Sequence, residues 1–219
     1  KEFGINGIHL SRIHSDFDGF IKSGLGSSGA FSVALITAIN KRLNLGLTKD
    51  EIAEKAWKIE VKKLGWFGGK QDQYAAVYGG FNKIFFGKNV EVIPYPRIMG
   101  DDLVPHLSLF YIGGFRESRK IQKGFKKLTK EQISILGKIK DLVKYASDYI
   151  NNGNFKELGY LLHESWLLKK ESNKGVTNQR IDELYEKALH VGAWGGKILG
   201  AGGGGYMLYM SPPGKKEEI

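Results

Sequence analysis

The sequence contains no cysteine and only five prolines in 219 residues. Without cysteine, disulfide scaffolds, thiolate zinc sites, iron–sulfur clusters and cysteine nucleophiles are excluded. Long apolar runs are also missing, since the longest uncharged stretch, residues 23–40, is too polar for the roughly 20-residue span of a membrane helix. Residues 1–20 lack the basic start and the continuous apolar middle of a signal peptide. We therefore expect a folded, cytoplasmic chain with no membrane segment.

Acidic residues are outnumbered by basic ones. Lysine and arginine number 33 against 23 aspartates and glutamates, which gives a net charge of +10. Nine basic and two acidic residues lie between residues 119 and 144, a run that we expect on one helix. Because aromatic residues do not alternate with the basic ones and no nucleic-acid motif accompanies them, a solvated helix face is favoured over a nucleic-acid surface.

Glycine, in contrast, is in excess. The chain has 30 glycines in 219 residues, roughly twice the usual fraction. They occur in clusters without a fixed period, which is typical neither of collagen nor of a flexible linker. Clustered glycines indicate that backbone approaches a ligand closely. The clusters are residues 24–29, 65–69, 79–80, 192–196 and 200–205.

Hydrophobic periodicity predicts an α+β chain in two lobes, residues 1–104 and 105–219. The capping-box pattern occurs at Thr48–Glu51 and at Thr129–Gln132, and each marks the start of a helix. Ser27 or Ser28 is expected to start another helix. The expected strands are residues 5–10, 81–86, 90–93, 107–112 and 206–210, and the remaining expected helices are residues 30–39, 71–78, 155–169 and 178–190.

The first glycine cluster stands directly before the apolar helix of residues 30–39. Glycines allow backbone N–H groups to point into a concavity, and the positive end of the helix dipole favours an anion such as a polyphosphate there. The serines of the cluster suit phosphate oxygens or Mg²⁺, whereas a tight turn with serine caps is the structural alternative. The cluster consists of Gly24, Leu25, Gly26, Ser27, Ser28 and Gly29.

Two well-known nucleotide motifs do not fit this chain. Residues 24–29 and 200–205 both match G-x-G-x-x-G, but neither match has a strand before it and a helix after it, as a dinucleotide fold requires. The phosphate-binding pattern G-x-x-x-x-G-K-[ST] does not occur, since Lys70 is followed by Gln71 and Lys197 by Ile198. A nicotinamide enzyme and a Walker-type ATPase are therefore both disfavoured.

Two carboxylates are candidates for chemistry. Asp72 lies beside Lys70 at the start of the helix expected over residues 71–78. The helix dipole and Lys70 would keep Asp72 ionised, which suits the acceptance of a hydroxyl proton. A simple helix N-cap is the alternative for Asp72. Glu60 lies on the helix that follows Thr48, where a glutamate usually faces solvent.

Four segments, taken in order, resemble a known family. They are SGLGSSGAF, GKQDQYAAVYGGFN, LLHESWLLKK and GAWGGKILGAGGGGYML. Together they are similar to the GHMP small-molecule kinases, and within these to the D-glycero-D-manno-heptose 7-phosphate kinases. The resemblance implies a ribosomal-S5-like N-terminal lobe, a ferredoxin-like C-terminal lobe and ATP between them.

The resemblance also implies roles for individual residues. Residues 24–29 would wrap the phosphates of ATP, Ser28 and Glu60 would hold Mg²⁺, and Asp72 would be the catalytic carboxylate. The acceptor would be a sugar phosphate, phosphorylated at its anomeric hydroxyl. The residues expected near the acceptor are Gln71, Arg116, Lys197, Gly202 and Gly203.

The strand-rich opening segment of the family has no match here, so we expect the N-terminal part of the fold to be incomplete. The alternative function is a non-catalytic fragment or a basic binding protein that keeps the kinase fold. The combination of Ser28, Glu60 and Asp72 argues against it, because a pure binding module needs no such set. Oligomeric state has no signal in the sequence.

Overall fold

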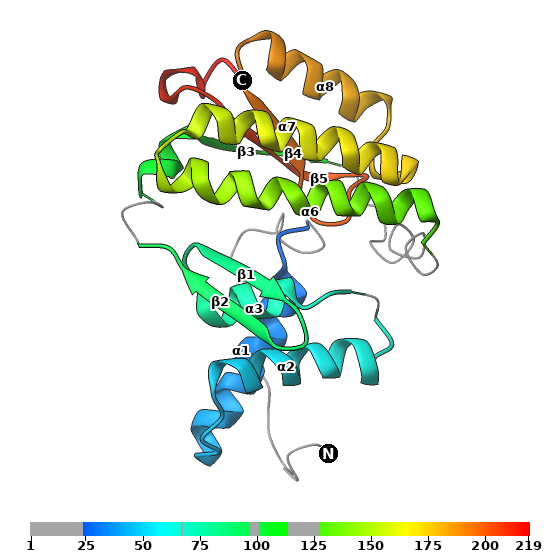
Figure 1. Cartoon of the computed structure of the whole chain (residues 1–219). Helices are drawn as coiled ribbons and strands as arrows, with labels where there is room; N and C mark the ends of the chain where they lie inside the picture. Colours follow the sequence, from blue (N-terminus) through cyan, green and yellow to red (C-terminus); the bar gives the residue numbers. More distant parts are fainter. Residues whose placement is uncertain (1–23, 67, 97–100, 114–127) are drawn as a thin grey trace.

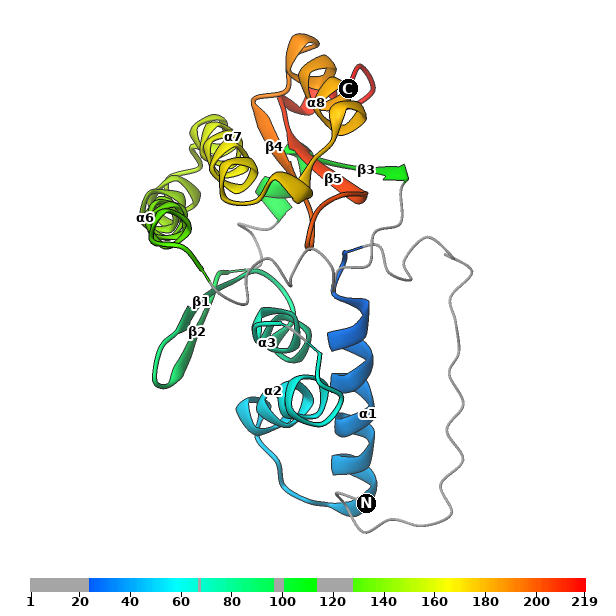
Figure 2. The same ribbon diagram turned by 90° about the vertical axis from the view of Figure 1, so that its right-hand side faces the viewer.

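The computed structural model describes residues 24–66, 68–96, 101–113 and 128–219. Figures 1 and 2 show two groups of elements. One contains three helices and a β-hairpin from the first half of the chain, and the other contains three helices and a three-stranded sheet from the second half. The α+β prediction is confirmed, and the boundary between residues 104 and 105 stays a prediction.

The first group is built on three helices that pack against one another. They are α1 (Ser27–Leu43), α2 (Lys49–Lys58), which continues into the π-helical turn η2 (Ile59–Lys63), and α3 (Gln71–Tyr78). Their core contains Val33, Ile36, Ile52 and Ala56. The antiparallel hairpin of β1 (Asn82–Phe86) and β2 (Val90–Pro94) follows α3.

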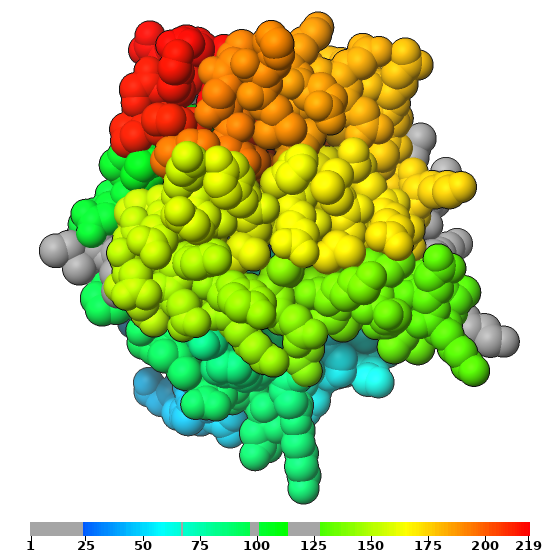
Figure 3. Space-filling view, turned by 45° about the horizontal axis from the view of Figure 1, so that its top comes forward, coloured from blue at the N-terminus to red at the C-terminus, as the bar shows by residue number. Residues whose placement is uncertain are grey.

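The second group places helices against an antiparallel sheet with the strand order β3-β5-β4. Its strands are β3 (Leu107–Gly113), β4 (Gly195–Ile198) and β5 (Gly205–Met210). Its helices are α6 (Lys130–Asn151), α7 (Phe155–Ser172) and α8 (Gln179–His190), and Figure 3 shows them side by side on one face. Trp166, Tyr185 and Met207 are fully buried in its core. The short helical turns are η3 (Val104–His106), η4 (Lys174–Val176) and η5 (Pro213–Lys215).

The hairpin joins the two groups by packing against α6. Lys83 Nζ donates a hydrogen bond to Ser147 Oγ over 3.0 Å, and the hydroxyls of Tyr95 and Ser147 lie 2.9 Å apart. Phe81 and Tyr95 also pack on the cluster that contains Ile150. These contacts fix how the elements of the first half face those of the second half.

Most helix starts follow the local signals. Both capping boxes are formed, at Thr48 with Glu51 and at Thr129 with Gln132. The prediction that a serine starts α1 is only partly right, because Gly26 is the N-cap, in a left-handed conformation. The basic run of residues 119–144 is not one helix, since α6 begins at Lys130 after its Thr129 cap, while residues 119–127 lie outside the described residues.

Strand β4 was not predicted, because its glycines carry no apolar pattern. The reason for these glycines is tertiary: a Cβ on Gly195 would lie only 2.1 Å from the Gly159 carbonyl oxygen on α7. Only glycine lets the strand approach the helix this closely. The strand expected over residues 5–10 lies outside the described residues. Within the part that is described, the helices are all too short or too polar to cross a membrane.

Candidate active site

The glycine loop of residues 24–29 leads into the N-terminus of α1. Gly24 and Gly26 both have positive φ angles, 86° and 71°, a conformation that favours glycine. No side chain of the described residues caps the helix, and its first turn contains no acidic residue. The first N–H groups of α1 are therefore left for another hydrogen-bond acceptor, and the positive end of the dipole favours an anion.

Asp72 lies directly against this loop. A Cβ on Gly29 would be 3.0 Å from the Asp72 Cβ, and one on Gly26 would be 3.4 Å from the Asp72 Cγ. Gln71 Nε2 lies 3.4 Å from Asp72 Oδ1, and both side chains are exposed in the first turn of α3. The helix N-cap is Lys70 and not Asp72. The carboxylate is thus available beside the loop without a capping role.

Glu60 is the buried carboxylate of the site, with 6% of its surface exposed. It lies in the π-helical turn η2, and π-turns inside helices frequently occur at functional sites. Its Oε1 accepts hydrogen bonds from Ser28 Oγ at 3.3 Å and Ser32 Oγ at 2.6 Å. Its Oε2 accepts one from Gln73 Nε2 at 2.6 Å. The structure therefore brings Ser28 and Glu60 together, as expected.

Ser32 and Gln73 were missed by the sequence reasoning. Ser32 lies four residues after Ser28 and therefore on the same face of α1, and Gln73 directly follows Asp72. These two spacings were the only sequence signals for Ser32 and Gln73, and both are weak. Gln73 Oε1 is buried and has no hydrogen-bond partner in the part of the chain that the structure describes. A buried carboxylate, a nearby hydroxyl and an unpaired amide oxygen are hard oxygen ligands of the kind that Mg²⁺ accepts.

The oxygen ligands fit Mg²⁺ only as a partial site. Within the described ranges, no group of three or more histidine, cysteine, aspartate or glutamate side chains could hold a metal ion. This agrees with the usual binding of Mg²⁺ through one or two carboxylates plus substrate phosphates and water. The protein alone offers Glu60 and Ser28 for that purpose.

Lys70 does not support Asp72 in the way that the sequence suggested. Its ammonium group forms an ion pair with Glu54 at 2.5 Å and lies over the Trp57 ring, 4.6 Å from the ring centroid. Tyr74 also donates a hydrogen bond to Glu54, at 3.1 Å. Burial, with Glu54 beside it, raises the pKa of Tyr74. Lys70 therefore ties the start of α3 to α2, because its partner is Glu54.

The second glycine loop, residues 200–205, touches the first. A Cβ on Gly200 would lie 2.7 Å from the Gly24 Cα, and one on Gly24 would lie 3.0 Å from the Leu199 carbonyl oxygen. The backbones of the two glycine loops are therefore in direct contact. The role of Gly202 and Gly203 beside an acceptor stays a prediction.

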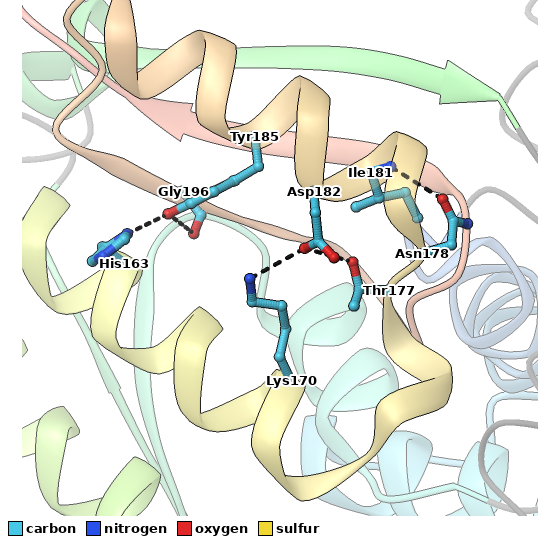
Figure 4. Close-up of polar contacts among 8 residues, drawn as sticks. All are labelled: His163, Lys170, Thr177, Asn178, Ile181, Asp182, Tyr185 and Gly196. Carbon is cyan, nitrogen blue, oxygen red and sulfur yellow. Dashed lines mark hydrogen bonds and ion pairs between the residues drawn. The ribbon is translucent and has the colours of Figure 1, made fainter.

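The turn η4 holds the second loop from behind. Gly203 N donates a hydrogen bond to the Val176 carbonyl at 2.8 Å, and a Cβ on Gly202 would lie 2.8 Å from that oxygen. Next to it, Thr177 Oγ1 donates to Asp182 Oδ1 at 3.0 Å, and Lys170 Nζ lies 3.1 Å from the same oxygen (Figure 4). These bonds anchor η4 to α7 and α8.

Two lysines lie where β4 runs into the second loop. Lys169 Nζ donates hydrogen bonds to the carbonyls of Gly200 at 2.8 Å and Ile198 at 3.4 Å. Burial, together with the nearby charge of Lys197, lowers the pKa of Lys169 to about 8. Burial also lowers the pKa of Lys197. The sequence did not single out Lys169 as a site residue, because nothing in the sequence distinguishes it from Lys170. The predicted acceptor residue Arg116 lies outside the described residues.

Comparison with known proteins identifies the family. Residues 1–80 match the GHMP kinases N terminal domain, and residues 138–219 match the GHMP kinases C terminal domain. A D-glycero-alpha-D-manno-heptose 7-phosphate kinase of Campylobacter jejuni is 36% identical over 225 residues, which cover 100% of this chain and 66% of that protein. A mevalonate kinase of Pyrococcus furiosus is 32% identical over 91% of this chain and 59% of its own length.

A solved structure gives the same result. The crystal structure of a D-glycero-D-manno-heptose 1-phosphate kinase from Bacteroides thetaiotaomicron superposes with a TM-score of 0.67, is 30% identical and covers 90% of this chain and 56% of its own. The chain thus spans between 56% and 66% of the length of these three relatives. Since both family models match and the relatives cover 90% or more of the chain, it belongs to the GHMP kinase family.

Proposed function

We propose that the protein transfers the terminal phosphoryl group of ATP to a sugar phosphate, at the anomeric hydroxyl of D-glycero-D-manno-heptose 7-phosphate. The single observation that carries the proposal is the contact of Asp72 with the glycine loop at Gly26 and Gly29. A carboxylate at an uncapped, glycine-rich helix N-terminus is arranged for a hydroxyl that attacks a bound phosphate.

The nucleotide phosphates would lie on the loop of residues 24–29, where the N–H groups at the start of α1 would donate hydrogen bonds to the phosphate oxygens. Ser28 and Glu60 would hold the accompanying Mg²⁺. That ion neutralises charge on the phosphates when it is bound. Ser32 and Gln73 orient Glu60 through hydrogen bonds of 2.6 Å each, so its carboxylate is held in place before the nucleotide arrives.

Asp72 would orient the acceptor hydroxyl and take its proton. As the new bond forms between the acceptor oxygen and the phosphorus, the bond from phosphorus to the leaving oxygen of ADP breaks. The proton of the hydroxyl passes to the Asp72 carboxylate. Positioning and charge neutralisation supply most of the acceleration in such transfers.

The choice of a sugar phosphate as acceptor rests on the relatives. A heptose 7-phosphate kinase is 36% identical, but a mevalonate kinase reaches 32%, so both classes must be tested. We assign Gln71, Arg116, Lys197, Gly202 and Gly203 to the acceptor side. The nucleotide would lie between a lobe of residues 1–104 and a lobe of residues 105–219.

The test is ADP formation from ATP and Mg²⁺ in the presence of heptose 7-phosphate, mevalonate or galactose as the acceptor. We expect turnover to be fastest with heptose 7-phosphate. Faster turnover of mevalonate or galactose would contradict the choice of acceptor, and no turnover of any of them by the full-length protein would contradict the proposal as a whole. In the second case, stabilisation against heat by mixed DNA or RNA, but not by Mg-ATP, would favour the basic binding protein.

A further inference from the structure

Lys169 and Lys197 enter one small region from two elements. Lys169 is in the last turn of α7, and Lys197 lies in β4. Side chains two residues apart on a strand share a face, so Lys197 lies on the face of Gly195. That face is covered by α7, since a Cβ on Gly195 would lie 2.9 Å from the His163 Cβ. Lys169 Nζ reaches the end of β4, where it lies 3.4 Å from the Ile198 carbonyl oxygen. The charge of Lys197 is near enough to lower the pKa of Lys169.

Among the described residues, this pair of cations has no acidic partner. Lys169 donates to the carbonyls of Ile198 and Gly200, which are neutral. Lys197 forms no ion pair with any residue that the structure describes. The neighbouring Lys170, by contrast, forms an ion pair with Asp182 over 3.1 Å (Figure 4).

Both lysines are partly buried, and their pKa values are lowered by burial, with the charge of Lys197 adding to the effect on Lys169. Two like charges withdrawn from water raise the free energy of the empty site. A doubly negative group bound between them would remove that cost, and a phosphate with charge near −2 matches two ammonium groups.

The position of the pair indicates which phosphate it serves. Lys169 holds the carbonyl of Gly200, and Gly200 touches Gly24, so the pair lies next to the junction of the two glycine loops. The nucleotide phosphates already have the uncapped start of α1 and Ser28 on the first loop. Because the pair lies at the second loop and not at the start of α1, it remains for a phosphate other than those of the nucleotide.

We infer that Lys169 and Lys197 bind the phosphate group that the acceptor already carries before transfer, which makes them a recognition site for phosphorylated sugars. The inference rests on the proposed function and deepens it. Lys197 would contact the phosphate directly, and Lys169 would contribute charge while it holds the second loop.

The kinetic test compares Lys197→Met and Lys197→Arg with heptose 7-phosphate and with the unphosphorylated heptose. We expect Lys197→Met to raise KM for the phosphorylated sugar by roughly 10–100-fold, with a change of less than about threefold for the unphosphorylated one. Lys197→Arg should restore most of the difference. The control is Lys138→Met, which removes the same charge from an exposed position on α6. Equal effects on both sugars would overturn the inference.

A binding readout separates this inference from the proposed function. Lysines with a lowered pKa react faster with an amine reagent at pH 8, because more of the neutral amine is present. We expect inorganic phosphate and heptose 7-phosphate to protect Lys169 and Lys197 from labelling, measured by mass spectrometry, whether or not turnover is seen. Absence of protection, or protection by ATP alone, would overturn the inference. Absence of turnover with protection retained would count against the proposed function only.

Discussion

Gly200 and Gly24 lie in backbone contact, although they belong to glycine clusters at opposite ends of the chain. A Cβ on Gly200 would come within 2.7 Å of the Gly24 Cα and within 3.0 Å of its carbonyl oxygen. The atoms that such a Cβ would meet belong to the backbone, so neither loop could make room for it by rotating a side chain. The second loop therefore restricts the backbone conformations that the first loop can adopt.

Gly200→Ala should disturb this junction. Gly200 also has a φ of 63°, so the substitution adds backbone strain to the collision with Gly24. We expect the free energy of unfolding to fall by roughly 2–4 kcal/mol and ATP affinity to fall about tenfold or more. Chemical denaturation and nucleotide titration measure the two effects.

The matched control is Gly46→Ala. Gly46 has a φ of 67°, but no described residue lies within 4 Å of a Cβ placed there, so the substitution adds backbone strain without a collision. It should cost about 1–2 kcal/mol and leave ATP affinity unchanged. Similar losses in both variants would mean that the contact between the loops has no role in nucleotide binding.

In the full-length protein, Asp72→Asn should lower kcat by roughly 10²–10⁴ and leave ATP affinity within a few fold, because the amide keeps the shape of the side chain but cannot accept the proton. Steady-state kinetics and nucleotide titration check this. Asp148→Asn, at an exposed position on α6, is the control for loss of one carboxylate. Near-normal turnover of Asp72→Asn would remove Asp72 from the mechanism.

Ser28 and Ser32 offer a matched pair for the metal assignment, since both donate to the same oxygen of Glu60. The bond from Ser32 is 2.6 Å and that from Ser28 is 3.3 Å. Ser32→Ala should therefore lower stability more, by roughly 1–2 kcal/mol. Ser28→Ala should raise the Mg²⁺ concentration needed for half-maximal activity about tenfold, with little loss of stability.

Glu60→Gln should raise the Mg²⁺ requirement at least as much as Ser28→Ala, because an amide is a weaker ligand than a carboxylate. The measurement is activity against Mg²⁺ concentration at saturating ATP, with a denaturation curve for each variant. An unchanged Mg²⁺ dependence in both Glu60→Gln and Ser28→Ala would show that the metal is held elsewhere.

Stability should rise with pH between about 8 and 10. The pKa of Lys169 is about 8 in the folded protein, against an ordinary value of 10.5 for a lysine. In this window the unfolded chain binds more protons than the folded one, so the free energy of unfolding increases as pH rises. The buried charge costs most below pH 8, and the cost disappears as the folded form loses its proton. Lys197, whose pKa is also lowered, acts in the same direction.

Lys169→Met should flatten this rise by about 1–3 kcal/mol, and Lys197→Met should flatten it in the same direction, whereas Lys138→Met should leave it unchanged. Urea denaturation at intervals between pH 7 and 10 gives the slope. Above pH 10 the buried tyrosines Tyr185 and Tyr209 oppose the trend, because burial raises their pKa values. If stability rises with pH equally steeply in the wild type and in both variants, the inference that burial of these two lysine charges destabilises the folded protein is wrong.

The sequence by itself determined the elements whose signals are local. The capping boxes at Thr48 and Thr129 form as predicted, and α3 has the predicted bounds of residues 71–78. Asp72 was found because the segment that carries it is distinctive in sequence. Such features depend on residues within one or two turns, so the chain encodes them without reference to distant contacts.

Only the tertiary structure decided what distant residues do to one another. Glu60 has the sequence pattern of an exposed helical glutamate, yet α1 and α3 bury it under Ser32 and Gln73. Lys70 pairs with Glu54 on α2 and not with Asp72. Lys169 and Lys170 are neighbours on α7, but Lys169 contacts a backbone carbonyl of the second glycine loop, whereas Lys170 pairs with Asp182. Burial and pairing of a charge depend on which elements meet across the fold, and no local pattern records that.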